Sequence, residues 1–137
     1  MYPPEITVPM ENELVSKGFD ALRTSKEVDD VIAKEGTTLV VVNSVCGCAA
    51  GAARPGVLDS LENGKKPSNL VTVFAGVDTD AVQQARNYML PYPPSSPAVA
   101  LFKDGKLVHM VERHHIEGRS YDMISGHLKM VYDEYCD

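Results

Sequence analysis

The chain has 137 residues, of which 44% are hydrophobic and 23% charged, a balance typical of one globular domain with a buried core. Its formal net charge is −6 at pH 7, and its lysines and arginines form no cluster. A nucleic-acid partner is therefore not expected, because binding to a phosphate backbone requires a basic face. The three cysteines are an odd number and do not form the framework of a secreted, disulfide-rich protein.

Hydropathy argues against a membrane partner. No apolar stretch is long enough to cross a bilayer, and Met1–Glu5 lacks the basic and then apolar pattern of a signal peptide. We therefore expect a cytoplasmic protein. In a reducing compartment, a close pair of cysteines is more often catalytic, redox-sensing or metal-binding than structural.

The N-terminal third predicts an irregular start followed by two helices. Residues 1–9 are rich in proline and are expected to be irregular. Residues 10–17 show a weak helical spacing of apolar side chains. Thr24 and Glu27 form the pattern of a capping box, so a second helix is expected from there to Gly36.

The central part predicts strand, helix, strand and helix in that order. Residues 37–42 form a continuous β-branched and apolar run, typical of a strand buried on both faces. A helix is expected over residues 48–61, bent or interrupted near Pro55. A second strand is expected at 71–75 and a further helix at 79–89. Because a helix connects the two strands, we expect them to be parallel.

The C-terminal part predicts a hairpin and a final helix. Residues 98–102 and 107–111 are short apolar runs separated by a loop with Asp104-Gly105, a strong hairpin signal. Residues 121–135 are amphipathic, and the expected apolar stripe is Tyr121, Ile124, Leu128, Val131 and Tyr135. The whole order predicts one α/β domain over residues 1–137, with a mixed central sheet flanked by helices and an extra N-terminal helix.

Two thiols separated by one glycine follow the first central strand directly. Cys46, Gly47 and Cys48 stand where the strand ends and the next helix is expected to begin. Unpaired backbone N–H groups and the helix dipole at such a position favour a thiolate, which is the reactive form of cysteine. The motif therefore points to thiol–disulfide exchange. The structural alternative is that both cysteines are small buried apolar residues.

Metal binding is the main alternative from another class of protein. The two thiolates could hold Zn²⁺ or Cu⁺, with His114, His115 or Cys136 completing the shell. A spacing of one residue is short for zinc, and there is no second cysteine pair, so no metal is expected. We instead expect the two histidines in a solvated loop and Cys136 as a free thiol at a frayed terminus.

Several short motifs are spread along the chain. They are Asn43-Ser44-Val45-Cys46-Gly47-Cys48-Ala49-Ala50-Gly51, Ala53-Arg54-Pro55, Val73-Phe74-Ala75-Gly76, Ser95-Ser96-Pro97, Arg113-His114 and Ile116-Glu117-Gly118. Together they resemble the bacilliredoxin family of small bacterial thioredoxin-like proteins, over about residues 8–136. The resemblance implies the thioredoxin fold.

The resemblance also implies roles for individual residues. Cys46 would be the nucleophile and Cys48 the resolving thiol, and Cys46, earlier in the turn, is expected to be the more exposed sulfur. Gly47, Ser96 and Pro97 are the expected substrate-binding positions, with a cis peptide bond before Pro97.

Three further residues could support the turn. Asn43 and Ser44 are expected to hydrogen-bond near it, most simply as caps of the strand end. Arg54 could stabilise the thiolate, bind an acidic group of the substrate, or lie solvated on a helix face.

The activity implied by the resemblance is removal of bacillithiol from mixed disulfides on proteins. Weak protein disulfide isomerase or reductase activity is the alternative within the same chemistry. The expected partners are bacillithiolated or disulfide-containing proteins and the low-molecular-weight thiol itself. No dissociable cofactor is expected, and the protein is expected to be a monomer or a weak dimer.

Overall fold

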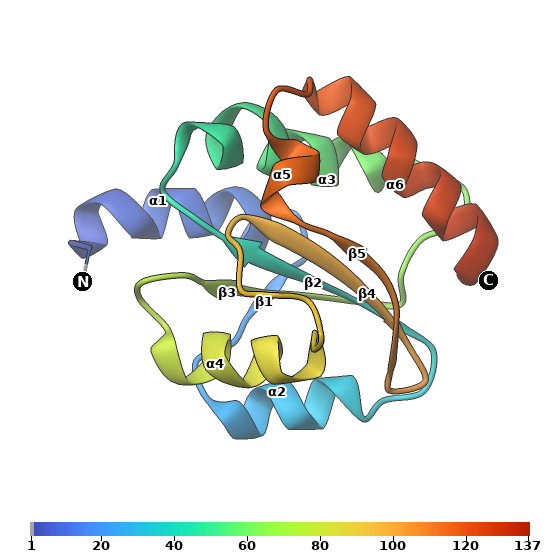
Figure 1. The fold of residues 1–137 in the computed structure, drawn as a ribbon, viewed down its shortest axis with the longest axis horizontal. Coiled ribbons are helices and arrows are strands. Elements are labelled where there is room, and N and C mark those ends of the chain that lie inside the picture. The colour runs from blue at the N-terminus through green and yellow to red at the C-terminus, as the bar shows by residue number, and fades with distance from the viewer. Residues whose placement is uncertain (1) are drawn as a thin grey trace.

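The computed structural model describes residues 2–137 and shows a five-stranded sheet between helices (Figure 1). The strands are β1 (Asp20–Ala21), β2 (Thr37–Asn43), β3 (Asn69–Phe74), β4 (Ala98–Lys103) and β5 (Lys106–Val111). The helices are α1 (Pro4–Val15), α2 (Ser25–Ile32), a π-helix η1 (Ala49–Ala53), α3 (Arg54–Ser60), α4 (Thr79–Tyr88), α5 (Arg113–Ile116) and α6 (Tyr121–Tyr135). Among residues 2–137, no helix has the length and hydropathy that crossing a bilayer needs. The α/β fold class is confirmed.

The sheet is mixed, with the strand order β1-β3-β2-β4-β5. Strands β2 and β3 are parallel, as the sequence predicts, whereas β4 is antiparallel to both β2 and β5. The central strand β2 is buried along its whole length, which explains its continuous run of β-branched and apolar residues. Its C-terminal end leads directly into the turn with the two thiols.

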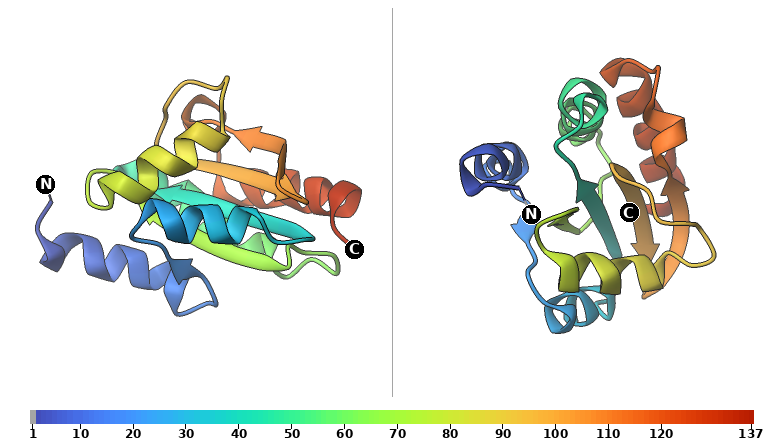
Figure 2. Two further views of the ribbon diagram at one scale, coloured as in Figure 1. Left: turned by 90° about the horizontal axis from the view of Figure 1, so that it is seen from below. Right: turned by 60° about the vertical axis from the view of Figure 1, so that its left-hand side comes forward.

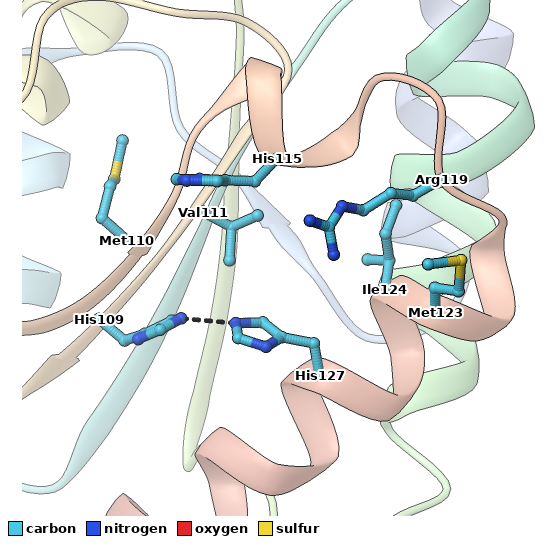
Figure 3. Close-up of a pocket in the computed structure, with 8 residues that line it drawn as sticks. All are labelled: His109, Met110, Val111, His115, Arg119, Met123, Ile124 and His127. Carbon is cyan, nitrogen blue, oxygen red and sulfur yellow. Dashed lines mark hydrogen bonds between the residues drawn. The ribbon is translucent and has the colours of Figure 1, made fainter.

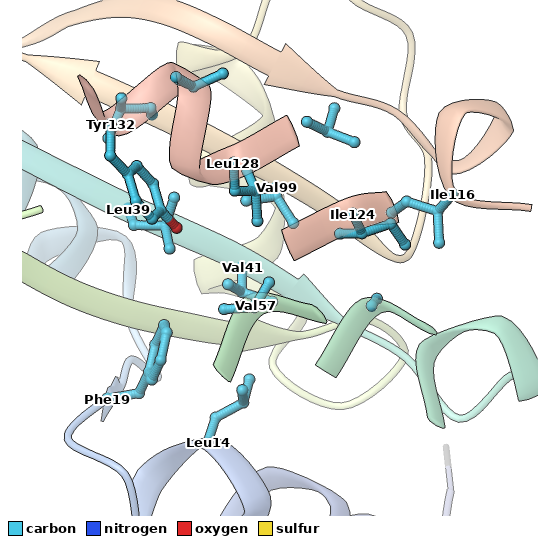
Figure 4. Packing of buried hydrophobic residues seen from close by; sticks show 14 of the residues in the cluster. Leu14, Phe19, Leu39, Val41, Val57, Val99, Ile116, Ile124, Leu128 and Tyr132 are labelled. Atoms are coloured by element: carbon cyan, nitrogen blue, oxygen red, sulfur yellow. The ribbon is translucent and has the colours of Figure 1, made fainter. Parts of the chain in front are cut away.

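Helices cover both faces of the sheet (Figures 1 and 2). Helices α2 and α4 lie on one face, over a core that includes Val28, Val40 and Ala81. Helices α1, α3 and α6 lie on the other face, where the core includes Leu14 and Tyr132 (Figure 4). The turn between β2 and η1 is therefore anchored by a strand whose two faces contact two separate cores.

The expectation of an irregular segment over residues 1–9 is wrong for the described residues, because helix α1 already begins at Pro4. Proline is accepted in the first turn of a helix, where its missing N–H would have no partner. The helix also contains Pro9, and its buried residues Thr7, Glu11 and Leu14 have helical spacing. Packing against the domain thus outweighs the local effect of proline. Met1 lies outside the described residues.

The other elements agree with the sequence to within a few residues. Thr24 and Glu27 form the expected capping box of α2, and the hairpin turn has positive φ at Asp104 and Gly105 (51° and 82°). In α6, however, Tyr121 is 44% exposed and Tyr132 is fully buried, so the buried stripe continues from Leu128 to Tyr132. The sequence also missed the two-residue edge strand β1 and the short helix α5, which are too short for a periodic pattern.

Helices α3 and α6 approach closely at Gly56, which yields a test of the packing. A Cβ atom at Gly56 would lie 2.8 Å from Ile124 Cγ2 and 2.9 Å from Ile124 Cβ. Gly56→Ala should therefore lower the free energy of unfolding by about 1–2 kcal/mol, because overpacking outweighs the helix-propensity gain of about 1 kcal/mol. Urea unfolding followed by circular dichroism measures the change.

The matched control is Gly126→Ala within α6, where a new Cβ would meet no atom within 4 Å. This variant should be more stable than the wild type by about 0.5–1 kcal/mol. Equal effects of the two substitutions would contradict the close approach at Gly56.

Candidate active site

The two thiols of Cys46 and Cys48 lie together in the turn that follows β2. Their Sγ atoms are 2.7 Å apart, and both cysteines are free and partly exposed. Both thiols are therefore within reach of solvent, and the greater exposure expected for Cys46 stays a prediction. Gly47 is exposed, has no positive φ, and a Cβ there would meet no atom within 4 Å. The turn thus does not require glycine for its backbone conformation, and a Cβ at position 47 would lie in open space apart from its two chain neighbours.

The helix after the thiols is α-helical at Gly47 and Cys48 but continues as a π-helix over Ala49–Ala53, rather than as the expected continuous α-helix. The N–H of Arg54 donates to the carbonyl of Ala49, the five-residue spacing of a π-helix. Pro55 lies in the first turn of α3, so the regular helix is interrupted just before Pro55, near the expected place. Since proline lacks an N–H and its ring crowds the carbonyl four residues earlier, that of Gly51, a wider turn before Pro55 is accommodated easily.

A buried hydrogen-bond network connects the end of β2, where the turn starts, with Arg54 and α1. The Asn43 side-chain oxygen accepts from the backbone N–H of Ser44 at 2.8 Å and from Arg54 Nη1 at 3.0 Å. Arg54 Nη1 also donates to the carbonyl of Ser44 at 3.0 Å. The Asn43 side-chain amide donates to the Met10 carbonyl at 3.3 Å, which ties the strand end to α1. The network therefore holds the backbone of Asn43 and Ser44, which leads into the turn with Cys46.

Two of the alternatives for Arg54 are therefore wrong: it is not solvated on a helix face, and it is not exposed to bind an acidic group of the substrate. Its side chain is 2% exposed, and its Nε lies 3.1 Å from Glu13 Oε1 of α1 as an ion pair without hydrogen-bond geometry. Its hydrogen bonds go to the Ser44 carbonyl and to Asn43. The residue acts through the position of the turn.

The surroundings of the two thiols shift their pKa values in opposite directions. Burial raises the pKa of Cys46, but hydrogen bonds from Cys48, Ser44 and the backbone of Ala49 outweigh burial, and the net pKa is lowered. Burial raises the pKa of Cys48, and the hydrogen bond and negative charge of Cys46 raise it further. Of the two sulfurs, Cys46 is thus the one that ionises first.

Ser44 has a double role in this arrangement. Its hydroxyl oxygen accepts from the backbone N–H of Cys46 at 3.2 Å, which caps the strand end as expected. The same hydroxyl lowers the pKa of the Cys46 thiol. Strand-end capping and thiolate stabilisation are therefore combined in one side chain.

The pairing of β2 with β4 places the loop before β4 next to the turn with the two thiols. Val42 pairs with Ala98, so the preceding Pro97 stands beside the end of β2. The Ser96–Pro97 peptide bond is cis, as expected, and Pro97 is buried. The carbonyl of Ser96 accepts from Arg113 Nη1 at 3.1 Å.

Arg113 is a site residue to which the sequence assigned no role. Its backbone N–H donates to Ser95 Oγ at 3.3 Å, its Nε pairs with Glu117 at 2.5 Å, and its charge lowers the pKa of both Cys46 and Cys48. It therefore connects the proline loop with the thiols. The available signal was the match of Arg113-His114 to the family motif, but the contact depends on the α5 turn, which the sequence did not predict.

The geometry argues against the proposed metal shell. Cys136 is buried rather than frayed, and its thiol contacts Thr37, at the start of β2. The cysteine pair follows the other end of this seven-residue strand, about 20 Å away. Within residues 2–137, the only close group of three potential ligands is Glu112, His114 and His115, which contains neither Cys46 nor Cys48. His114 and His115 are exposed, as expected, but belong to α5.

Comparisons with known proteins agree with this fold and site. A family model described as disulphide isomerase matches residues 2–136. A bacilliredoxin from Cytophaga hutchinsonii is 64% identical over 98% of this chain and 99% of its own, and one from Staphylococcus haemolyticus is 52% identical over 92% of this chain and 87% of its own.

Comparison with solved structures identifies the fold. A thioredoxin variant from Halobacterium salinarum has a TM-score of 0.61 at 19% identity, over 88% of this chain and 93% of its own. The thioredoxin-like domain of Arabidopsis NCP has a TM-score of 0.62 at 18% identity, over 86% of this chain and 79% of its own. Fold, thiol pair and relatives together define a thiol–disulfide oxidoreductase of the thioredoxin fold. The chain belongs to the bacilliredoxin family.

The charge of Arg113 provides a test of the site's electrostatics. Arg113→Gln should raise the pKa of the Cys46 thiol, because a positive charge that stabilises the thiolate is lost. Alkylation by iodoacetamide at neutral pH should become about threefold slower. Thiolate absorbance at 240 nm as a function of pH measures the shift. The matched control is Arg119→Gln, six residues further on; an equal shift in both variants would contradict the assignment.

The buried network provides a second test. Arg54→Met should lower the free energy of unfolding by about 2 kcal/mol, because the buried carbonyl of Ser44 would lose its hydrogen-bond donor. The exposed Lys34→Met serves as the control and should stay within about 0.5 kcal/mol of the wild type. Urea unfolding measures both. If Arg54→Met is as stable as the control, the guanidinium does not support the turn.

Proposed function

We propose that this protein removes bacillithiol from mixed disulfides on bacterial proteins, with Cys46 as the nucleophile and Cys48 as the resolving thiol. The observation that carries the proposal is the pair of partly exposed sulfurs whose pKa values are shifted in opposite directions. A nucleophile must ionise readily, whereas a resolving thiol can stay protonated until the mixed disulfide has formed. The bacilliredoxin relatives support the choice of thiol.

The reaction is proposed to proceed in two exchanges. The Cys46 thiolate attacks the bacillithiol sulfur, the sulfur–sulfur bond to the client breaks, and the client leaves as a thiolate that takes up a proton. Cys48 then loses its proton and attacks the Cys46 sulfur, which releases bacillithiol as a thiolate. The cysteine pair ends as a disulfide, so the pair has given two electrons to the mixed disulfide, which leaves as one client thiol and one free bacillithiol. A low-molecular-weight thiol as reductant regenerates the two thiols, and no dissociable cofactor is required.

Residues around the thiols have proposed roles in this cycle. Arg113 and the hydroxyl of Ser44 stabilise the Cys46 thiolate, as their effects on its pKa indicate. Gly47 leaves room for the substrate sulfur, and Ser96 and Pro97 are proposed to contact the client beside the turn. The clients are disulfide-containing or bacillithiolated proteins of the cytoplasm, and the protein is proposed to act as a monomer or weak dimer.

Protein disulfide isomerase or reductase activity is the second candidate function. It is favoured by the description of the matching family model and by the partial exposure of both sulfurs. The same nucleophile would attack a client disulfide. In isomerisation a client thiol would then resolve the mixed disulfide, whereas in reduction Cys48 would resolve it and the cysteine pair would end as a disulfide. The two candidates differ in the substrate sulfur that Cys46 attacks.

A dethiolation assay with a bacillithiolated client tests the first candidate. The wild type should release bacillithiol faster than it releases glutathione from the same client modified with glutathione. Cys46→Ala should be inactive, because the nucleophile is lost, whereas Cys48→Ala should accumulate a mixed disulfide between Cys46 and bacillithiol. Mass spectrometry identifies this species.

The control variant is Cys136→Ala, which removes a buried thiol at the other end of β2 and should leave the rate unchanged. If the wild type releases no bacillithiol but rearranges a scrambled disulfide protein, the second candidate replaces the first. Full dethiolation activity in Cys46→Ala would refute both.

A further inference from the structure

A pocket lies between β5 and α6, and α5 closes one of its ends (Figure 3). Its volume is about 180 Å³. Three of the four histidines of the chain line it, namely His109, His115 and His127, together with Arg119. Neither Cys46 nor Cys48 lines it, so it is separate from the thiol site.

The polar side chains that line this pocket are three imidazoles and one guanidinium, all of which can offer an N–H donor. His115 Nδ1 accepts from the backbone N–H of Glu112 at 3.1 Å, so the neutral ring carries its proton on Nε2. His109 and His127 share one hydrogen bond between their Nε2 atoms at 2.8 Å, which leaves an N–H on the Nδ1 of the accepting ring. No aspartate or glutamate lines the pocket.

Arg119 is the fixed positive charge of the pocket. Its side chain extends between His115 and His127 in Figure 3, and among residues 2–137 it forms no ion pair. An unpaired guanidinium among three imidazoles disfavours a cation and favours an anion with planar, bidentate geometry. In a chain with a net charge of −6, such a carboxylate-free cationic lining is a local exception.

The rest of the lining is apolar. Val111 and Ile124 are buried beneath the polar groups, and Met123 is exposed at the rim. A bare inorganic anion would leave this apolar surface in contact with water. A carboxylate attached to a small apolar body would cover it and also pair with Arg119.

We propose that the pocket between β5 and α6 binds a small organic carboxylate with an apolar body, held by Arg119 and the three histidines. The proposal goes beyond the thiol chemistry of Cys46 and does not depend on it.

Mutual repulsion within the pocket supports the proposal. Burial lowers the pKa of His109 and of His115, and neighbouring cations lower both further. The charged groups that act on these two rings are His114, His115, His127 and Arg119, which lower a pKa, and Glu112 and Glu134, which raise one. A bound anion opposes the repulsion and should raise the histidine pKa values, so binding should be tighter at pH 6 than at pH 8.

Histidine NMR on the full chain tests the proposal, with benzoate as the probe and ionic strength held constant. Benzoate should shift the Cε1–Hε1 signals of His109, His115 and His127 saturably, and His114, which does not line the pocket, should move least. Benzamide has the same ring without the charge, and inorganic phosphate has charge without the ring. Both should bind at least about tenfold more weakly than benzoate.

Three variants complete the experiment. Arg119→Gln should weaken benzoate binding about tenfold, because a charged hydrogen-bond donor is lost. Lys106→Gln removes an exposed positive charge from β5 outside the pocket and should leave the affinity unchanged. Cys46→Ser should also bind normally, which separates this site from the redox function.

The proposal is overturned by any of three results. One is the absence of saturable shifts up to the solubility limit of benzoate. Another is equal binding of benzamide or phosphate, which would indicate an apolar cavity or a general anion site. The third is unchanged affinity in Arg119→Gln.

Discussion

The buried guanidinium of Arg54 fixes the strand end from which the reactive turn starts. It connects Asn43 and Ser44 of the strand end with α3, and Glu13 of α1 lies beside it. A buried arginine is costly unless it is paired, and here Nη1 donates to Asn43 Oδ1 and to the Ser44 carbonyl, while Nε lies beside the Glu13 carboxylate. The position of Cys46 therefore depends on contacts between residues far apart in the sequence, although the thiol itself comes from a short local motif.

On this fixed backbone, small local interactions distinguish two chemically identical thiols. Cys46 and Cys48 share the same turn and are both partly exposed, yet the hydroxyl of Ser44 and the backbone of Ala49 favour the thiolate of Cys46. Once that thiolate forms, its charge raises the pKa of Cys48. One site therefore holds a ready nucleophile beside a protonated thiol, and this difference is what a two-step exchange requires.

Features set by neighbouring residues could be predicted from the sequence. The capping box of α2 and the Asp104-Gly105 turn depend on contacts within a few residues, and the strand β2 is marked by its own continuous β-branched and apolar run. The structure confirms all three. The Cys46-Gly47-Cys48 motif was also sufficient to locate the thiol site.

Features set by distant contacts were missed or assigned wrongly. Helix α1 starts at Pro4 because its buried side chains pack on the domain, and Arg54 is buried because Asn43 and Ser44 lie opposite it. Arg113 lies near the thiols only because β5 and β2 end at the same edge of the sheet and α5 follows β5 directly.

The central claim is that Cys46 is the thiol that ionises first. Limited alkylation of the reduced protein at neutral pH, with mass spectrometry of the labelled peptide, tests it most directly: the account predicts label first on Cys46, and first labelling of Cys48 would contradict it.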